Sequence, residues 1–230
     1  MVSCSSDPEQ DATSKGAPNV ARCDRFQKES VMRRLVFCTV AFVAANLPRP
    51  AGASHWEIDP QHTSAQFAVR HLVVSTVRGT LGTVTGSVNL DEADISKSSV
   101  EATIDAAGML TRDGMRDEHL KGPDFLYVTK YPKVTFKSKK VEKVADGKFK
   151  VTGDLMLRGV TKEIALDVEG TPKAFHDQAG VLKLGGVAKT RISRRDFGME
   201  YNKTLVDGGG LVVGNDVDII IDIELEEAAE

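Results

Sequence analysis

The sequence predicts an all-β protein, an eight-stranded antiparallel barrel with a short helix at one mouth. Apolar and polar residues alternate in about eight short stretches after Trp56, which is the spacing of strands with one buried face. Turn signals such as Asp146-Gly147 and Ala179-Gly180 separate the stretches evenly, as is typical of an antiparallel barrel or sandwich. Residues 111–128 depart from the alternation and are expected to hold the helix.

The first 53 residues are expected to lie outside the barrel. Met32-Arg33-Arg34 is followed by an apolar run of 11 residues, 35–45, and then by Ala51-Gly52-Ala53. Basic, apolar and small residues in that order are typical of a secretory signal peptide, and the run is too short to span a bilayer. We therefore expect 1–31 to be upstream sequence before a start at Met32, 32–53 to be the signal peptide, and cleavage near Ala53.

Residues 54–230 are then expected to form one exported domain of 177 residues with a formal net charge of −5, against −3 for the whole chain. A nucleic-acid-binding domain that works by bulk attraction is excluded, because such domains are strongly basic. All three cysteines, Cys4, Cys23 and Cys38, precede residue 54. Thiol nucleophiles, cysteine metal sites and disulfides are therefore excluded from the domain.

The strands are predicted where the alternation is clearest. In the last one, apolar residues at every second position from Val217 to Leu225 are separated by Asp218, Asp222 and Glu224. Lys133 and other charged residues occupy the same alternate positions elsewhere, so the charged face is expected to point outward and the apolar face inward. The predicted strands are residues 64–71, 83–90, 99–106, 133–137, 149–157, 164–168, 182–192 and 217–226.

The helix is predicted from residue 111 to Gly122-Pro123, which is a helix stop. Met115 and His119 are expected on one face, a second turn is expected over 124–127, and the segment is expected to cross one mouth of the barrel. Glycines inside the strand patterns permit bends and close approach of backbones. Those that face inward are also expected to leave room in the interior.

A barrel of eight strands either fills its interior with side chains or holds one small ligand. Each inward residue taken singly fits a dry core, whereas the set as a whole fits a cavity for an elongated apolar ligand. Both alternatives stay open from the sequence. The candidate lining residues are Phe67, Val69, Val84, Val88, Ile104, Phe136, Leu155, Leu157, Leu166, Leu184, Ile219 and Ile221.

Polar residues in two dense clusters, 113–121 and 191–198, are candidates for holding a headgroup at the rim, and His71 is a further candidate outside them. The candidates are His71, Arg116, Asp117, His119 and Arg194. The alternative is that the first cluster is an ion-paired helix anchored to the rim and that Arg194 fixes a turn by bonding backbone carbonyls. The spacing of His62, His71 and His119 fixes no metal geometry, and the sequence holds no GxSxG, HExxH, phosphate-loop or dinucleotide motif. We expect no metal, no cofactor and no catalytic set.

Several motifs follow one another in order along residues 54–230. They are Trp56-x-Ile58-Asp59-x-x-His62, Phe67-x-Val69-x-His71-Leu72, Arg116-Asp117-x-His119-Leu120-Lys121, Tyr131-Pro132-x-Val134, Gly153-Asp154-Leu155-x-Leu157 and Arg194-x-Asp196-Phe197-Gly198. With these motifs the chain resembles the YceI-like family of lipocalin-like, polyisoprenoid-binding periplasmic proteins. One position departs from the family pattern, because Ser193 stands where an asparagine usually precedes the arginine.

The resemblance implies a carrier that holds a long isoprenoid lipid, of the quinone or polyprenyl type, inside the barrel with its headgroup at the mouth. It also implies that dimers are common. We further expect transient contact with a membrane surface and no nucleic-acid partner. Two other functions stay open: an enzyme that modifies an isoprenoid lipid with His119 and Asp117 as acid and base, and a stress protein whose packed barrel binds nothing.

Overall fold

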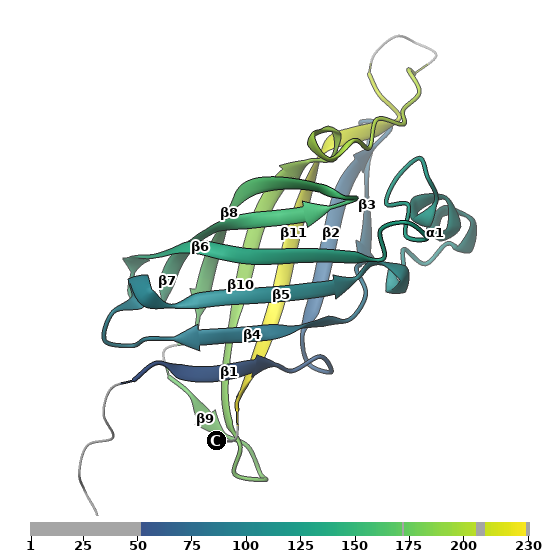
Figure 1. Ribbon diagram of the computed structural model, residues 1–230. Helices are drawn as coiled ribbons and strands as arrows, with labels where there is room; N and C mark the ends of the chain where they lie inside the picture. Colours follow the sequence, from purple (N-terminus) through teal and green to yellow (C-terminus); the bar gives the residue numbers. More distant parts are fainter. Residues whose placement is uncertain (1–51, 172, 206–209, 229–230) are drawn as a thin grey trace, which may run out of the picture. The chain divides into compact units, whose positions relative to one another are not determined.

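The structure, a computed structural model, describes residues 52–171, 173–205 and 210–228 (Figure 1). The predicted start at Met32 and the apolar run 35–45 lie outside the described residues. The signal peptide and its cleavage near Ala53 therefore stay predictions. In the described part of the chain, no helix has the length and apolar character needed to cross a membrane.

Eight antiparallel strands form a closed ring, which confirms the predicted barrel. The order around the ring is β11-β1-β4-β5-β6-β7-β8-β10, and β10 pairs in turn with β11. The ring strands are β1 (Ser54–Ile58), β4 (Val84–Leu90), β5 (Ser99–Asp105), β6 (Lys133–Ala145), β7 (Lys148–Leu157), β8 (Val160–Gly170), β10 (Leu182–Ser193) and β11 (Val213–Glu227).

Three further strands extend this sheet, namely β2 (Ser64–His71), β3 (Ser75–Thr80) and β9 (Phe175–His176). β1 and β2 both pair with the long β11, β1 near its end and β2 along its first ten residues. Residues 59–63, which connect β1 to β2, belong to neither strand. β3 forms a hairpin with β2, and β9 pairs with β10. The sequence pattern predicted β2 but neither β1, β3 nor β9 as separate strands.

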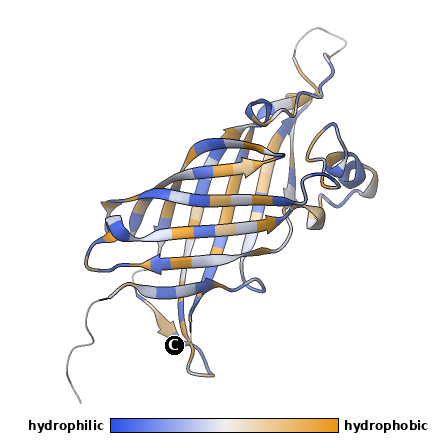
Figure 2. Ribbon diagram, viewed as in Figure 1, coloured by the Kyte–Doolittle hydropathy of each residue, from blue (hydrophilic) through white to orange (hydrophobic). Residues whose placement is uncertain are grey.

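Hydrophilic and hydrophobic residues alternate along the strands, as predicted (Figure 2). In β11, Asp218 and Asp222 are exposed, whereas Ile219 and Ile221 between and beside them face the cavity described below. The buried core lies inside the ring and joins residues of β1, β4, β5, β6, β7, β10 and β11 in one cluster.

The helix α1 (Gly114–Lys121) lies at one end of the barrel (Figure 1). Its first turn is capped by Asp113, whose Oδ1 accepts a hydrogen bond from the Arg116 backbone N–H at 3.0 Å. The helix ends at Gly122, as predicted, and a turn follows in which Phe125 N donates to the Gly122 carbonyl at 3.1 Å. Met115 and His119 lie four residues apart in the helix and therefore share a face, as predicted. That face is turned to solvent, because Met115 is 86% exposed and His119 is exposed as well.

Short 3-10 helices form three of the turns: η1 (Ile95–Lys97), η2 (Ala106–Gly108) and η3 (Arg194–Phe197). The last of them follows β10 and ends at Gly198, whose φ of 72° is in the left-handed region that favours glycine. Phe197 is buried below this turn. Met199, the residue after Gly198, lines the cavity described below. The η3 turn therefore covers part of one end of the barrel.

Glycines inside the strands permit close approach of backbones rather than leaving empty space. A side chain added at Gly153 would collide with the Lys137 carbonyl oxygen, and one at Gly86, whose φ is 144°, would collide with that of Glu101. The expectation that inward glycines make room is therefore wrong for these positions. Close approach was the other role that the sequence allowed.

Candidate functional site

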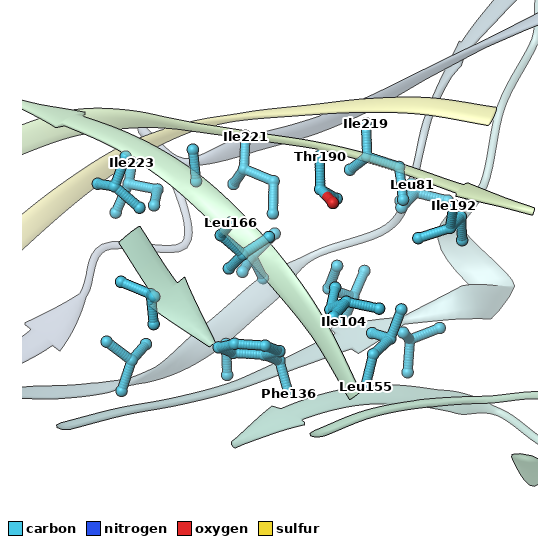
Figure 3. Close-up of a pocket in the computed structure, with 18 of the residues that line it drawn as sticks. Leu81, Ile104, Phe136, Leu155, Leu166, Thr190, Ile192, Ile219, Ile221 and Ile223 are labelled. Atoms are coloured by element: carbon cyan, nitrogen blue, oxygen red, sulfur yellow. The ribbon is translucent and has the colours of Figure 1, made fainter. Parts of the chain in front are cut away.

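The barrel encloses a cavity of about 320 Å³, and every ring strand contributes to its wall. Side chains such as Ile104, Phe136, Leu166 and Ile221 point toward one another across it (Figure 3). An engineered apolar cavity of about 150 Å³ stays dry and binds benzene, and ligand pockets commonly measure about 300–1,000 Å³. The interior is therefore large enough for part of an elongated ligand.

The structure places all twelve predicted lining residues at this cavity: Phe67, Val69, Val84, Val88, Ile104, Phe136, Leu155, Leu157, Leu166, Leu184, Ile219 and Ile221. Contact of these residues with a ligand stays a prediction. The wall also contains residues outside the predicted set, many of them on the same strands, and four that lie outside any strand: Leu120, Phe125, Leu126 and Met199. These four lie in the helix, in the turn after it and after η3, where no alternation of period two marks an inward residue.

The cavity wall is almost wholly apolar. Among the described residues that line it, the polar ones are Ser98, Thr135, Thr190 and Arg194, and none is a histidine, aspartate or glutamate. The Thr190 hydroxyl already donates to the Ala165 carbonyl at 2.8 Å. Such a wall favours hydrocarbon, whose burial stabilises by about 0.8 kcal/mol per methylene, and it offers no side chain for proton transfer.

Two of the predicted rim residues, Arg116 and Asp117, hold the segment before α1 instead of lining the cavity. Asp117 is buried, and its Oδ1 accepts hydrogen bonds from the Thr111 backbone N–H at 2.7 Å and from the Thr111 hydroxyl. Arg116 donates from Nε to Thr111 Oγ1 and from Nη2 to the Thr111 carbonyl, both at 2.7 Å. The polar groups of both side chains are thus used in anchoring the helix.

His119 and His71 are also absent from the cavity wall. His119 Nε2 lies 2.9 Å from Asp124 Oδ2, and its ring meets Phe125 and Tyr201 edge-on, with centroids 5.1 and 4.8 Å apart. Because Phe125 lines the cavity, His119 packs behind the wall. His71 ends β2 and pairs with β3 and β11. The structure does not bring the rim candidates together around one point.

Arg194 is the one rim candidate at the cavity wall in the described part of the chain, and it is 3% exposed. Its Nε donates to the Gly214 carbonyl at 2.9 Å and its Nη1 to the Met199 carbonyl at 2.6 Å. Burial lowers the pKa of the guanidinium. These bonds to backbone carbonyls are the alternative that the sequence left open, and they fasten the segment after η3 to the start of β11.

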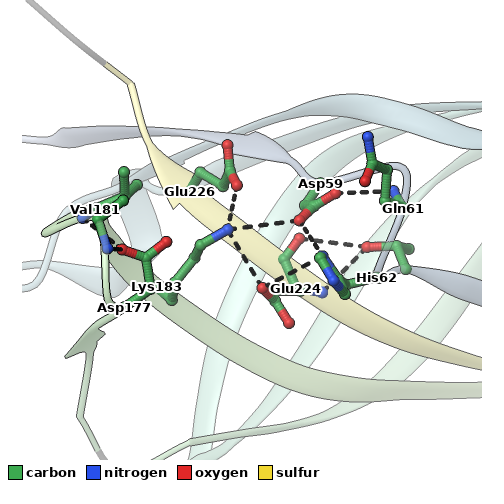
Figure 4. Close-up of polar contacts among 10 residues, drawn as sticks. Asp59, Gln61, His62, Asp177, Val181, Lys183, Glu224 and Glu226 are labelled. Carbon is green, nitrogen blue, oxygen red and sulfur yellow. Dashed lines mark hydrogen bonds and ion pairs between the residues drawn. The ribbon is translucent and has the colours of Figure 1, made fainter.

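A polar cluster that sequence reasoning missed lies where β1 gives way to β2 (Figure 4). His62 Nδ1 lies 2.5 Å from Asp59 Oδ2 and 3.8 Å from Glu224 Oε1. Lys183 Nζ lies 3.5 Å from Asp59 Oδ2 and 3.3 Å from Glu224 Oε1, and it also pairs with Glu226. The cluster joins β10 and β11 to the break after β1, so residues far apart in the sequence meet only once the register of these strands is set.

The charges of this cluster stabilise one another. The hydrogen bond from His62 lowers the pKa of Asp59 to about 2, and the same bond raises the pKa of His62. Glu226 and Glu224 raise the pKa of Lys183. Asp59, His62 and Glu224 are the one group in the described residues whose ligand atoms converge enough for a metal ion. The Lys183 ammonium already supplies a positive charge to two of them.

Comparisons with known proteins agree with this fold. A family model described as the YceI-like domain matches residues 56–225. A UPF0312 protein of Vibrio parahaemolyticus is 37% identical over 168 residues, covering 72% of this chain and 88% of that protein. The crystal structure of a Campylobacter jejuni YceI protein is 31% identical with a TM-score of 0.58, covering 70% of this chain and 90% of that one. A polyisoprenoid-binding domain from Saccharophagus degradans, implicated in plant cell wall breakdown, is 15% identical with a TM-score of 0.53, covering 75% of this chain and 98% of that one.

Proposed function

This chain belongs to the YceI-like family, and from that premise we propose that it binds a long isoprenoid lipid inside the barrel and carries it in the periplasm. The family resemblance supplies the ligand class. The polyisoprenoid binding of the Saccharophagus degradans domain supports it. The periplasmic location rests on the predicted signal peptide, residues 32–53.

The observation that carries the proposal is the cavity itself. A closed ring of strands surrounds about 320 Å³ of space with a wall of aliphatic and aromatic side chains. Filling that space with water would leave the water without hydrogen-bond partners, because a buried water needs two to four polar groups. A hydrocarbon chain fits the wall without that cost, so the interior is suited to the isoprenoid part of a lipid.

The headgroup of such a lipid is expected outside this wall. A quinone ring or a polyprenyl phosphate carries oxygens that need hydrogen bonds when buried. The polar nitrogens of Arg194 are bonded to carbonyl oxygens, and no carboxylate or histidine in the described residues lines the cavity. The headgroup therefore belongs at a mouth of the barrel, where water can solvate it.

We propose a carrier rather than an enzyme because the acid and base expected of an enzyme are engaged elsewhere. Asp117 is bonded to Thr111, and His119 is bonded to Asp124 and packs behind the cavity wall. A packed barrel that binds nothing, the other interpretation, is not supported by an interior with about 320 Å³ of free volume.

Mass spectrometry of the protein purified from its own host without detergent tests this function. Native spectra are expected to show a mass increment, and organic extraction is expected to release an unmodified isoprenoid lipid of that mass. The control is the same protein after extraction and refolding, which should lose the increment and regain it when incubated with the extract. A protein with no increment that also takes up no added isoprenoid would overturn the proposal.

A further inference from the structure

The turn between β2 and β3 exposes three consecutive aliphatic side chains. Leu72, Val73 and Val74, here called the β2–β3 tip, are 38%, 56% and 80% exposed. Leu211, which is also 38% exposed, lies in the neighbouring segment, whose Val212 carbonyl accepts a hydrogen bond from Leu72 N at 2.8 Å. Single exposed aliphatic residues are ordinary, but a contiguous set on a protruding turn marks a contact surface.

The backbone of the tip is held in a conformation that its residues disfavour. Leu72 and Val73 have φ values of 51° and 64°, a region in which hairpin turns normally use asparagine or glycine and in which a β-branched residue is rare. Arg70 secures the turn by donating to the Val73 carbonyl and, at 3.0 Å, to Thr76 Oγ1. Two aliphatic residues are thus kept where small polar ones would be less strained, which points to a role for their side chains.

The surroundings of the tip are basic in a chain that is acidic as a whole. Residues 60–90, which include β2, β3 and β4, contain no aspartate or glutamate, although the chain has 33 acidic residues. Arg70 and Arg78 give the hairpin two positive charges, and both are exposed. Two carboxylates of β11 lie opposite β2. Asp218 Oδ1 lies 2.6 Å from Arg191 Nε, and Asp222 Oδ2 accepts a hydrogen bond from Gln66 Nε2 at 3.2 Å. Among the described residues, no carboxylate forms an ion pair with Arg70 or Arg78. Aliphatic side chains beside these two positive charges match the surface of an anionic bilayer.

The tip also continues the wall of the cavity. Val69 and its partner Val217 both line the cavity. Further along the two strands Val213, which also lines the cavity, lies opposite His71, and His71 leads directly into the turn (Figure 1). A bilayer in contact with the tip would therefore lie against the end of the barrel that α1 and η3 close. The hairpin brings the source of a lipid and the apolar interior close together.

We propose that the β2–β3 tip inserts into the surface of an anionic lipid bilayer and docks the barrel there for lipid exchange, a role that rests on the proposed function. A few aliphatic side chains with a small basic patch give weak, reversible membrane binding, as a carrier requires. A second copy of the chain fits the β2–β3 tip less well than a bilayer does. A stable protein interface buries about 1,200–2,000 Å², and a two-fold contact through the tip would set Arg70 against Arg70.

Co-sedimentation with vesicles tests the docking surface, using full-length mature protein with Val74→Asp and with Val144→Asp as the matched control. Val144 is 67% exposed in the β6–β7 hairpin, far along the chain from the tip. Binding of the wild type to phosphatidylcholine–phosphatidylglycerol vesicles is expected to exceed binding to pure phosphatidylcholine vesicles. Val74→Asp should lower binding about tenfold, while Val144→Asp leaves it unchanged.

Two further measurements distinguish membrane docking from self-association and from lipid binding inside the barrel. Light scattering reports the oligomeric state, and a wild-type dimer that Val74→Asp converts to a monomer would assign the tip to a contact between copies and overturn membrane docking. Membrane docking would also be overturned by an equal loss of vesicle binding in both variants, or by a wild type that binds neither kind of vesicle. Uptake of an isoprenoid from solution should be equal in wild type and Val74→Asp, and its absence in both would contradict the proposed function instead.

Discussion

At the scale of single residues, His62 and Asp59 are the pair whose protonation is tied most directly to the fold. Both residues belong to a motif that the sequence carries openly, Trp56-x-Ile58-Asp59-x-x-His62. Their partners Lys183 and Glu224 are 124 and 165 residues away from Asp59 in the chain. Sequence reasoning could find the motif but not the cluster, because the partners are set by the pairing of β10 with β11.

The pair predicts a definite dependence of stability on pH. Because His62 has a raised pKa in the folded protein, its contribution is complete below about pH 6.5 and is lost as pH rises through the raised value. Asp59, with a folded pKa of about 2, contributes fully above about pH 4, and that contribution is lost as pH falls toward 2. The free energy of urea unfolding of wild type minus that of His62→Gln should be largest near about pH 5 and shrink toward about pH 9.

The control for this series is His176→Gln, which removes an exposed imidazole from β9. A wild-type advantage over His62→Gln that stays constant across the alkaline range would contradict the role given to the His62–Asp59 hydrogen bond.

At the scale of elements, α1 shows where sequence patterns stop being informative. Its end at Gly122-Pro123 was predictable from helix-stop chemistry, and its existence followed from the missing alternation. Its orientation was not predictable. A helix of eight residues makes about two turns, and the polar contacts of Asp117 and Arg116 with Thr111 decide which side faces the protein, leaving Met115 in solvent.

Removing the Asp117 carboxylate should therefore loosen the helix. Asp117→Ala leaves the buried Thr111 N–H and hydroxyl without their acceptor, which is expected to cost about 1–3 kcal/mol of unfolding free energy. Chemical denaturation followed by circular dichroism measures this cost. Glu118→Ala, at the exposed neighbouring position, should change it by less than about 0.5 kcal/mol, and an equal effect of the two substitutions would show that Asp117 anchors nothing.

At the scale of the whole molecule, alternation predicted the barrel and the side chains that line it, but not the free volume inside. The period of a strand says which face a residue takes, whereas the size of the interior depends on how eight inner faces approach one another. Gly153 and Gly86 illustrate the difference. From the sequence they suggested empty space, and in the structure they let neighbouring backbones come closer.

Filling the cavity should abolish cargo binding without unfolding the barrel. Ala102 lines the cavity on β5, whereas Ala165 lies exposed on the outer face of β8. Ala102→Phe is expected to lower affinity for a fluorescent isoprenoid by about tenfold or more, with a melting temperature close to that of wild type. Ala165→Phe makes the same addition outside the barrel and should bind normally. Unchanged affinity in Ala102→Phe would place the ligand elsewhere.

The break between β1 and β2 has a consequence for how the barrel opens. β1 has a short ladder on both sides, with three residue pairs to β11 and four to β4. β10 is joined to β8 over only four pairs, but to β11 over eleven. Short ladders open locally at a lower free energy than long ones, so β1 is the strand of the ring expected to separate most easily from its neighbours. The ion pairs of the Asp59–His62–Lys183–Glu224 cluster hold the end of β1 to β10 and β11. We therefore expect the wall to open first at β1 while the other seven strands stay paired, which would let a lipid longer than the cavity enter from the side.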